Sequence, residues 1–400
     1  MKFSVPTFWK HVITVLSGTV AAQALPLLVA PLITRLCTPE GMGTFGVWWG
    51  IISIASIAAT LRLDTAMILD HGSSEQQTCF SVVAWSATVL ALILTLLAVT
   101  ARTLGLPQAL HMPWFGLLTI GIGMWLVAYM QTMLAYATSY RAFGKAARAK
   151  IWAAGSIAMG QLSLLAIGMN GGVSLMAGQI TGLAIGVIAG IHFLSPPRTN
   201  LSLKLDAIQR TYLMKHQAFW RFALPAELLD VIGGQFPLFM IGAKYGVFYA
   251  GLFALTSRVM AAPISLLAAS VQEVFKRESI HDFQTIGNCK NTYERTFKAL
   301  FLLGCVPFLF ILIFAPSFFS WIFGEPWREA GEFARIMAPL YFLNFIASPL
   351  SYVFYASGKQ KINLIWHIAL FLMTICIFLL PLNLKESLWT YTIGYSFLYV

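Results

Sequence analysis

Three ionisable side chains stand inside long apolar stretches of this chain. Glu227 and Asp230 lie three residues apart, so they share one face of a helix. Arg258 lies in the next apolar stretch and reaches a comparable depth if the two helices are antiparallel. A charge at the centre of a bilayer costs about 2.5–3.5 kcal/mol, which makes such groups candidates for function. Arg258 predicts a cation site for a phosphorylated substrate, with a carboxylate that titrates or binds a coupling cation such as H+ or Na+. The alternative is a static ion pair between the two helices.

Charged groups also lie near the ends of two earlier apolar stretches. Arg62 and Asp64 are two residues apart, so they do not share a helix face, and either side chain could reach the cytoplasmic surface. Arg35 stands beside Thr38-Pro39-Glu40 at the opposite membrane surface. There it could guide a polyanionic lipid headgroup or cap the C-terminus of a helix.

Uncharged polar residues within apolar stretches could line a hydrophilic path for sugars. The candidates are Gln23, Gln131 and Gln235, although each could instead form a hydrogen bond between helices. The seven His and five Cys lack the spacing of a metal site or of a disulfide framework. No metal and no cofactor is therefore expected.

The composition identifies the elements that must position these residues. The 400 residues are 58% hydrophobic and only 10% charged, whereas soluble domains carry roughly 25% charged residues. This excludes a soluble enzyme, and the thinly spread Lys and Arg exclude a nucleic-acid-binding face. The long apolar runs predict an all-α polytopic membrane protein with about twelve transmembrane helices in two six-helix lobes. The predicted spans are 12–33, 45–69, 80–100, 114–138, 151–167, 173–194, 219–241, 248–275, 297–323, 333–356, 362–382 and 387 onward.

The chain divides near its midpoint. We expect an N-terminal lobe over 1–197, a cytoplasmic amphipathic linker over 198–218 and a C-terminal lobe over 219–400, whose last span is short or truncated. Phe8-Trp9-Lys10 and Phe219-Trp220-Arg221 open the two lobes, which suggests duplication of a six-helix unit. Most of the 26 Lys and Arg fall in alternate loops, which places the N-terminus in the cytoplasm.

Several motifs resemble a known family. Four segments resemble bacterial O-antigen and polysaccharide flippases. They are Gln23-Ala24-Leu25-Pro26, the segment from Leu32 to Phe45, Leu61-Arg62-Leu63-Asp64 and the stretch from Gly251 to Leu266. These flippases belong to the multidrug, oligosaccharidyl-lipid and polysaccharide exporter superfamily. In that family the positions of Glu227 and Asp230 usually hold uncharged residues, so carboxylates there are particular to this chain.

The resemblance implies a flippase that moves undecaprenyl-diphosphate-linked oligosaccharide, such as an O-antigen or lipopolysaccharide repeat unit, across the bacterial inner membrane by alternating access. The cationic residues suit the diphosphate and the polar residues suit the glycan. Other polysaccharide assembly proteins are the expected protein partners, and no covalent chemistry is implied. A multidrug or cation antiporter of the same superfamily is the first alternative. A membrane polysaccharide polymerase is the second, but the non-cytoplasmic loops are too short for an extracytoplasmic catalytic site.

Overall fold

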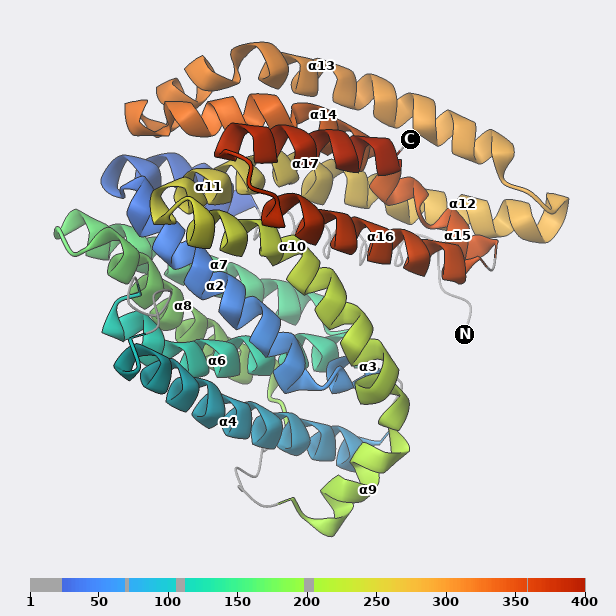
Figure 1. Cartoon of the computed structure of the whole chain (residues 1–400). Helices are drawn as coiled ribbons and strands as arrows, with labels where there is room; N and C mark the ends of the chain where they lie inside the picture. Colours follow the sequence, from blue (N-terminus) through green and yellow to red (C-terminus); the bar gives the residue numbers. More distant parts are fainter. Residues whose placement is uncertain (1–23, 69–71, 106–111, 198–204, 358, 400) are drawn as a thin grey trace. The chain divides into compact units, whose positions relative to one another are not determined.

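The structure is a computed structural model that describes residues 24–68, 72–105, 112–197, 205–357 and 359–399 (Figure 1). By internal contacts the chain separates into two compact units, unit 1 (Met1–Ile232) and unit 2 (Gly233–Val400). All regular elements in the described residues are helical. The all-α architecture expected from the composition is therefore confirmed.

Unit 1 opens on the helical segment Ala24–Leu36. Its further elements are α2 (Pro39–Thr60), α3 (Leu63–Met67), α4 (Ser73–Thr103), α6 (Trp114–Ser139), α7 (Phe143–Ala166), α8 (Gly171–Leu194), α9 (Ala207–Lys215) and the π-helix η1 (Phe219–Ala223). Helix α10 (Leu224–Lys244) begins in unit 1 and ends in unit 2.

Unit 2 continues with helices on both sides of a second π-helix. Its elements are α11 (Val247–Pro263), the π-helix η2 (Ile264–Ala268), α12 (Ala269–Ile286), α13 (Lys290–Phe323), the 3-10 helix η3 (Glu325–Trp327), α14 (Arg328–Leu350), α15 (Val353–Ala356), α16 (Gln360–Leu379) and α17 (Leu384–Tyr399).

Each predicted span coincides with helix in the part of the chain that the structure describes. Seven helices there are long and apolar enough to cross a membrane, and three shorter apolar helices, Ala24–Leu36, Val247–Pro263 and Ile365–Leu379, accompany them. Helices α7 and α17 belong to neither group: α7 starts with a cationic turn, and α17 has 16 residues. The protein is thus a multi-pass helical membrane protein.

Three predicted spans are interrupted, and the one expected over 333–356 breaks at Ser351 and Tyr352, between α14 and α15. The span expected over 45–69 breaks where Leu61 and Arg62 adopt left-handed backbone conformations with φ of 51° and 56°. The span expected over 248–275 changes to a π-helix directly after Pro263 and then continues to Ile286. A proline cannot donate the backbone hydrogen bond that a regular helix needs, which accounts for the irregularity at Pro263.

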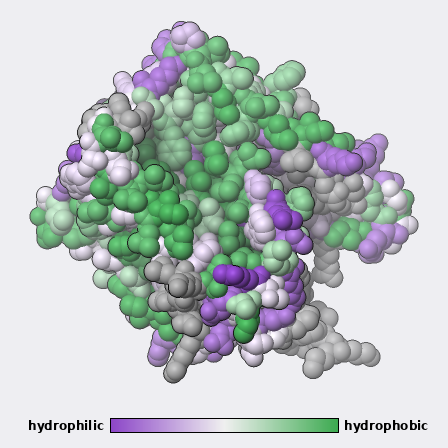
Figure 2. Space-filling view, turned by 60° about the horizontal axis from the view of Figure 1, so that its bottom comes forward, coloured by the Kyte–Doolittle hydropathy of each residue, from purple (hydrophilic) through white to green (hydrophobic). Residues whose placement is uncertain are grey.

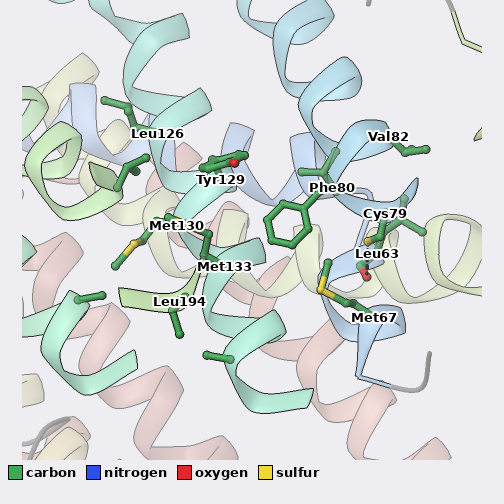
Figure 3. Close-up of a cluster of buried hydrophobic side chains, with 14 of the residues drawn as sticks. Leu63, Met67, Cys79, Phe80, Val82, Leu126, Tyr129, Met130, Met133 and Leu194 are labelled. Carbon is green, nitrogen blue, oxygen red and sulfur yellow. Dashed lines mark hydrogen bonds between the residues drawn. The ribbon is translucent and has the colours of Figure 1, made fainter. Parts of the chain in front are cut away.

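The core of unit 1 gathers side chains from six helices, α3, α4, α6, α7, α8 and α9. Figure 3 shows Leu63 and Met67 of α3 beside Phe80 of α4, with Tyr129 and Met133 of α6 close by. Phe80 meets Tyr129 edge-on, with ring centroids 5.8 Å apart. All five side chains are nearly or completely buried. Burial of such side chains stabilises a fold by about 1.5–3 kcal/mol each, so the short helix α3 is firmly seated.

Glycines let α7 and α8 pack at very short range. Gly178, Gly182 and Gly186 of α8 recur every fourth residue and face α7, where an added Cβ would lie 2.4 Å from the nearest atom at each of the three positions. The Gln161 side chain of α7 donates to the Leu175 carbonyl oxygen (3.1 Å) across this interface. Small residues that allow close approach are the usual means of helix association in a membrane.

Helix α14 is the centre of unit 2, where it packs against α11, α13 and α17. Phe333 and Phe345 of α14 are buried. The Thr256 hydroxyl of α11 donates to the Ala330 carbonyl oxygen of α14 at 2.8 Å. This buried bond fixes α11 against α14 next to Arg258.

Large apolar side chains cover much of the surface. Figure 2 shows broad hydrophobic areas on the visible face, with hydrophilic residues gathered in separate patches. Leu96 of α4 and Val306 of α13 are 65% and 74% exposed. Soluble proteins rarely expose contiguous apolar areas of this kind, whereas lipid chains satisfy them.

Candidate functional site

Arg62 lies at the break between α2 and α3. Its backbone is left-handed, and its amide donates to the Thr60 hydroxyl at 3.3 Å. A left-handed conformation costs a non-glycine residue about 1–2 kcal/mol. Neither glycine nor proline marks this break in the sequence, so periodicity alone predicted a continuous helix. Because of the break, the direction of the Arg62 side chain differs from the one it would have in a continuous helix.

The charged partner of Arg62 is Glu227 of α10. The Arg62 Nη1 atom lies 3.7 Å from the Glu227 Oε1 atom, and the two side chains are 25% and 39% exposed. At this distance the contact is an ion pair without a hydrogen bond. Partly exposed pairs of this kind contribute about 0.2–1 kcal/mol. Both residues belong to unit 1.

Further polar atoms at the break have no partner. The Arg62 Nε atom and the Asp64 Oδ1 atom are both buried and make no hydrogen bond within the described residues. Asp64 stands in the first turn of α3, where a carboxylate is favoured by the helix dipole. Leu63, the residue between Arg62 and Asp64, is buried in the core, and the expected separation of the two charged side chains onto different faces stays a prediction.

The two carboxylates of α10 lie in different surroundings. Glu227 is half-buried and paired with Arg62, whereas Asp230 is exposed one turn further along. Arg258 belongs to unit 2, and the alternative of a static pair between it and these carboxylates stays a prediction.

Arg258 lies in α11, two residues after the Thr256 that binds α14. Its side chain is half-buried, and it forms no hydrogen bond or ion pair with the described residues of its own unit. A guanidinium carries five N–H donors and keeps its charge at every physiological pH. None of these donors is used by the described residues of unit 2, so within that unit they can bind an anion.

Hydroxyl groups extend the polar interior of unit 2. The hydroxyls of Thr374 (α16) and Tyr395 (α17) are hydrogen-bonded at 2.9 Å. The side-chain oxygens of Thr392 and Ser396, also in α17, are buried and without a hydrogen bond in the described residues. These residues were not among the candidates from the sequence, although the seven Ser, Thr and Tyr residues from Ser387 onward could have indicated them.

The remaining candidates are Arg35 and three glutamines. Arg35 is exposed in the last turn of Ala24–Leu36, and the neighbouring Thr38 caps the N-terminus of α2, its hydroxyl accepting from the Gly41 amide at 3.3 Å. Gln131 in α6 and Gln235 in α10 are half-buried. Gln23 lies outside the described residues.

The expected linker contains the helix α9. Its Tyr212 side chain is buried in the core of unit 1, while Ile208 is 73% exposed. Lys215 forms an ion pair with Glu75 of α4, a contact that the sequence did not predict. The amphipathic pattern therefore places one face of α9 on α4, and the exposed Ile208 remains available to the membrane surface.

These observations define a class of protein. The chain is a multi-pass helical membrane protein in which Arg258 has no ion pair with the described residues of unit 2, and Arg62 has a 3.7 Å ion pair within unit 1. Its sequence matches the family described as polysaccharide biosynthesis protein over residues 32–332. The chain belongs to that family.

Solved structures share the fold at low sequence identity. The chain is similar to a lipid II flippase MurJ in an inward closed conformation (TM-score 0.74, 12% identity, 97% of this chain and 86% of that one). It is also similar to an inward-facing multidrug resistance MATE family transporter of the MOP superfamily (TM-score 0.72, 15% identity, 94% of this chain and 92% of that one). A third similar structure is a MOP superfamily transporter from Pyrococcus furiosus (TM-score 0.59, 13% identity, 98% of this chain and 93% of that one). A comparison with curated proteins gave no match.

Proposed function

We propose that this protein is a flippase for undecaprenyl-diphosphate-linked oligosaccharide in the bacterial inner membrane. It moves an O-antigen or related repeat unit from the cytoplasmic to the periplasmic leaflet by alternating access, with its N-terminus in the cytoplasm. Membership of a polysaccharide biosynthesis family supports a glycan substrate. The fold shared with a lipid II flippase supports a lipid-linked one.

The observation that carries this proposal is that the Arg258 guanidinium has no ion pair with the described residues of its own unit. A charge in an apolar helix costs about 2.5–3.5 kcal/mol, and no described carboxylate of unit 2 offsets that cost. A diphosphate offers several oxygen acceptors, which match the planar fork of donors on arginine. We assign Arg258, Arg62 and Arg35 to the diphosphate headgroup at successive stages of transport.

Uncharged polar groups serve the glycan. Gln23, Gln131 and Gln235 are assigned to its hydroxyl groups, and Thr392 and Ser396 add unsatisfied hydroxyls in unit 2. Glu227, Asp230 and Asp64 are the candidates for coupling to an H+ or Na+ gradient. No bond in the substrate forms or breaks, and the isoprenoid tail stays in lipid.

A multidrug or cation antiporter is the second candidate. The fold is shared with a multidrug resistance transporter, and the Glu227 carboxylate is only loosely paired, as a cation site requires. An antiporter binds cations through carboxylates, so Arg258 would be dispensable to it and Glu227 essential.

The experiment replaces Arg258 in cells that depend on the protein for surface polysaccharide. Arg258→Ala, present at the wild-type level, should abolish surface polymer while lipid-linked precursor accumulates inside. Arg221→Ala is the matched control, because Arg221 is exposed and bonded to Gln217. Full surface polymer from Arg258→Ala contradicts the proposal. Drug resistance that is lost with Glu227→Gln and kept with Arg258→Ala favours the antiporter.

A further inference from the structure

Arg62 is incompletely satisfied by its partner. Of its five N–H donors, none forms a hydrogen bond with the described residues, and its Nε atom is buried. The 3.7 Å contact with Glu227 supplies charge balance but no hydrogen bond. A guanidinium left in this state favours an anion that can offer two oxygens in the plane of its donors.

The Arg62 side chain is more buried than that of Glu227, at 25% against 39% exposed. Leu63, the next residue, is fully buried in the core of unit 1, which anchors the backbone at Arg62. Glu227 lies within the continuous helical segment Phe219–Lys244, four residues after the π-helix η1 and two residues after Pro225. Its side chain is 39% exposed, so the carboxylate can reach solvent.

The carboxylate of Glu227 therefore has the properties of a replaceable anion. It neutralises Arg62 while the site is empty, it adds at most about 1 kcal/mol to stability, and it can turn toward solvent. A diphosphate carries more charge than a carboxylate and presents more acceptors. It would compete for the same donors and win at sufficient concentration.

We propose that Glu227 is a resident counter-anion of Arg62 that the diphosphate headgroup of the substrate must displace. This inference rests on the proposed function, because it assumes that Arg62 binds the headgroup. Glu227 then sets the affinity of Arg62 for the diphosphate headgroup. It weakens diphosphate binding and so favours release after transport. It acts on the substrate through Arg62 and is a positioning residue.

The test measures binding of inorganic pyrophosphate to the purified full-length protein in nanodiscs of zwitterionic lipid. Glu227→Gln keeps the shape of the side chain and removes its charge. We expect it to bind pyrophosphate about two- to tenfold more tightly than wild type, the range set by losing a partly exposed ion pair and its repulsion of the ligand. Arg62→Gln should weaken binding, and the double variant should bind like Arg62→Gln alone.

Glu75→Gln is the matched control. Glu75 is also 39% exposed and paired with a cation, Lys215, in the same unit. Its variant should bind pyrophosphate like wild type, which separates the effect from a general change in net charge. A melting curve for each variant confirms that it is folded.

The outcomes separate the two proposals. If Arg62→Gln weakens binding but Glu227→Gln binds like wild type or more weakly, the pair is a structural contact and the inference fails alone. If Arg62→Gln binds like wild type, or neither wild type nor Glu227→Gln binds, the headgroup role of Arg62 fails and the inference fails with it.

Discussion

Gly182 in α8 offers the sharpest test of the packing in unit 1. An alanine Cβ at this position would lie 2.4 Å from the backbone nitrogen of Ile157 in α7 and 2.5 Å from its Cα atom. Ordinary contacts begin near 3.4 Å, so α7 would have to retreat by about 1 Å. Because Gly178 and Gly186 make equally close contacts, the retreat would open all three layers of the interface.

Two opposing effects determine how Gly182→Ala changes the free energy of unfolding. Overpacking costs about 1–3 kcal/mol, and a collision with backbone belongs at the upper end of that range. Alanine gains about 1 kcal/mol over glycine in helix propensity. Gly182→Ala should therefore destabilise the protein by about 2 kcal/mol, which lowers the melting temperature by roughly 4–8 °C for a unit of this size.

Thermal unfolding of the purified protein in detergent measures the effect, with Gly155→Ala as the matched control. Gly155 lies in α7, and an added Cβ there meets no atom within 4 Å. This variant keeps the propensity gain without the collision, so its melting temperature should equal or exceed that of wild type. The reasoning is refuted if Gly182→Ala melts at or above the temperature of Gly155→Ala.

Three further changes test separate features. Ser195→Gly should stabilise the protein by about 1 kcal/mol in thermal unfolding, because Ser195 ends α8 at a φ of 46° that glycine adopts without strain; no gain would contradict this. Thr256→Val should lower the melting temperature by the equivalent of about 0.5–1.5 kcal/mol, since the Ala330 carbonyl oxygen loses its hydrogen bond from the Thr256 hydroxyl; an unchanged value would show the bond to be dispensable. Burial raises the pKa of the Cys37 thiol from 9.0 to about 12, with a smaller effect from Glu40. The folded state thus holds this proton more tightly than the unfolded state. The free energy of unfolding of wild type, relative to that of Cys37→Ala, should therefore be constant below pH 9 and fall as the pH rises from 9 toward 12. A difference that does not change with pH would contradict the raised pKa of Cys37.

The sequence was sufficient to place the helices. Lipid imposes long apolar runs on every span, and each predicted span is largely helical in the described residues, with breaks at 61–62 and 351–352. The break at Leu61 and Arg62 escaped prediction because no glycine or proline marks it. The change to a π-helix after Pro263 could have been anticipated from the proline itself.

The site was only partly accessible from the sequence. The rarity of charge in apolar helices identified Arg62, Glu227 and Arg258, but the partner of Glu227 depends on how distant helices pack, which local spacing does not encode. The motif Thr38-Pro39-Glu40 was noted for its resemblance to a family. The structure gives its physical reason, since Thr38 caps α2 and Pro39 occupies the first helical position.

Transfer of a lipid-linked glycan between the leaflets of proteoliposomes tests the central claim most directly. The measurement follows a fluorescent undecaprenyl-diphosphate-linked saccharide with wild type, Arg258→Ala and Arg221→Ala at equal protein content. Loss of charge-assisted hydrogen bonds worth about 1.5–3 kcal/mol predicts that Arg258→Ala slows transfer at least about tenfold, while Arg221→Ala matches wild type. Equal rates for wild type and Arg258→Ala, or no transfer above protein-free liposomes by wild type, would contradict the account.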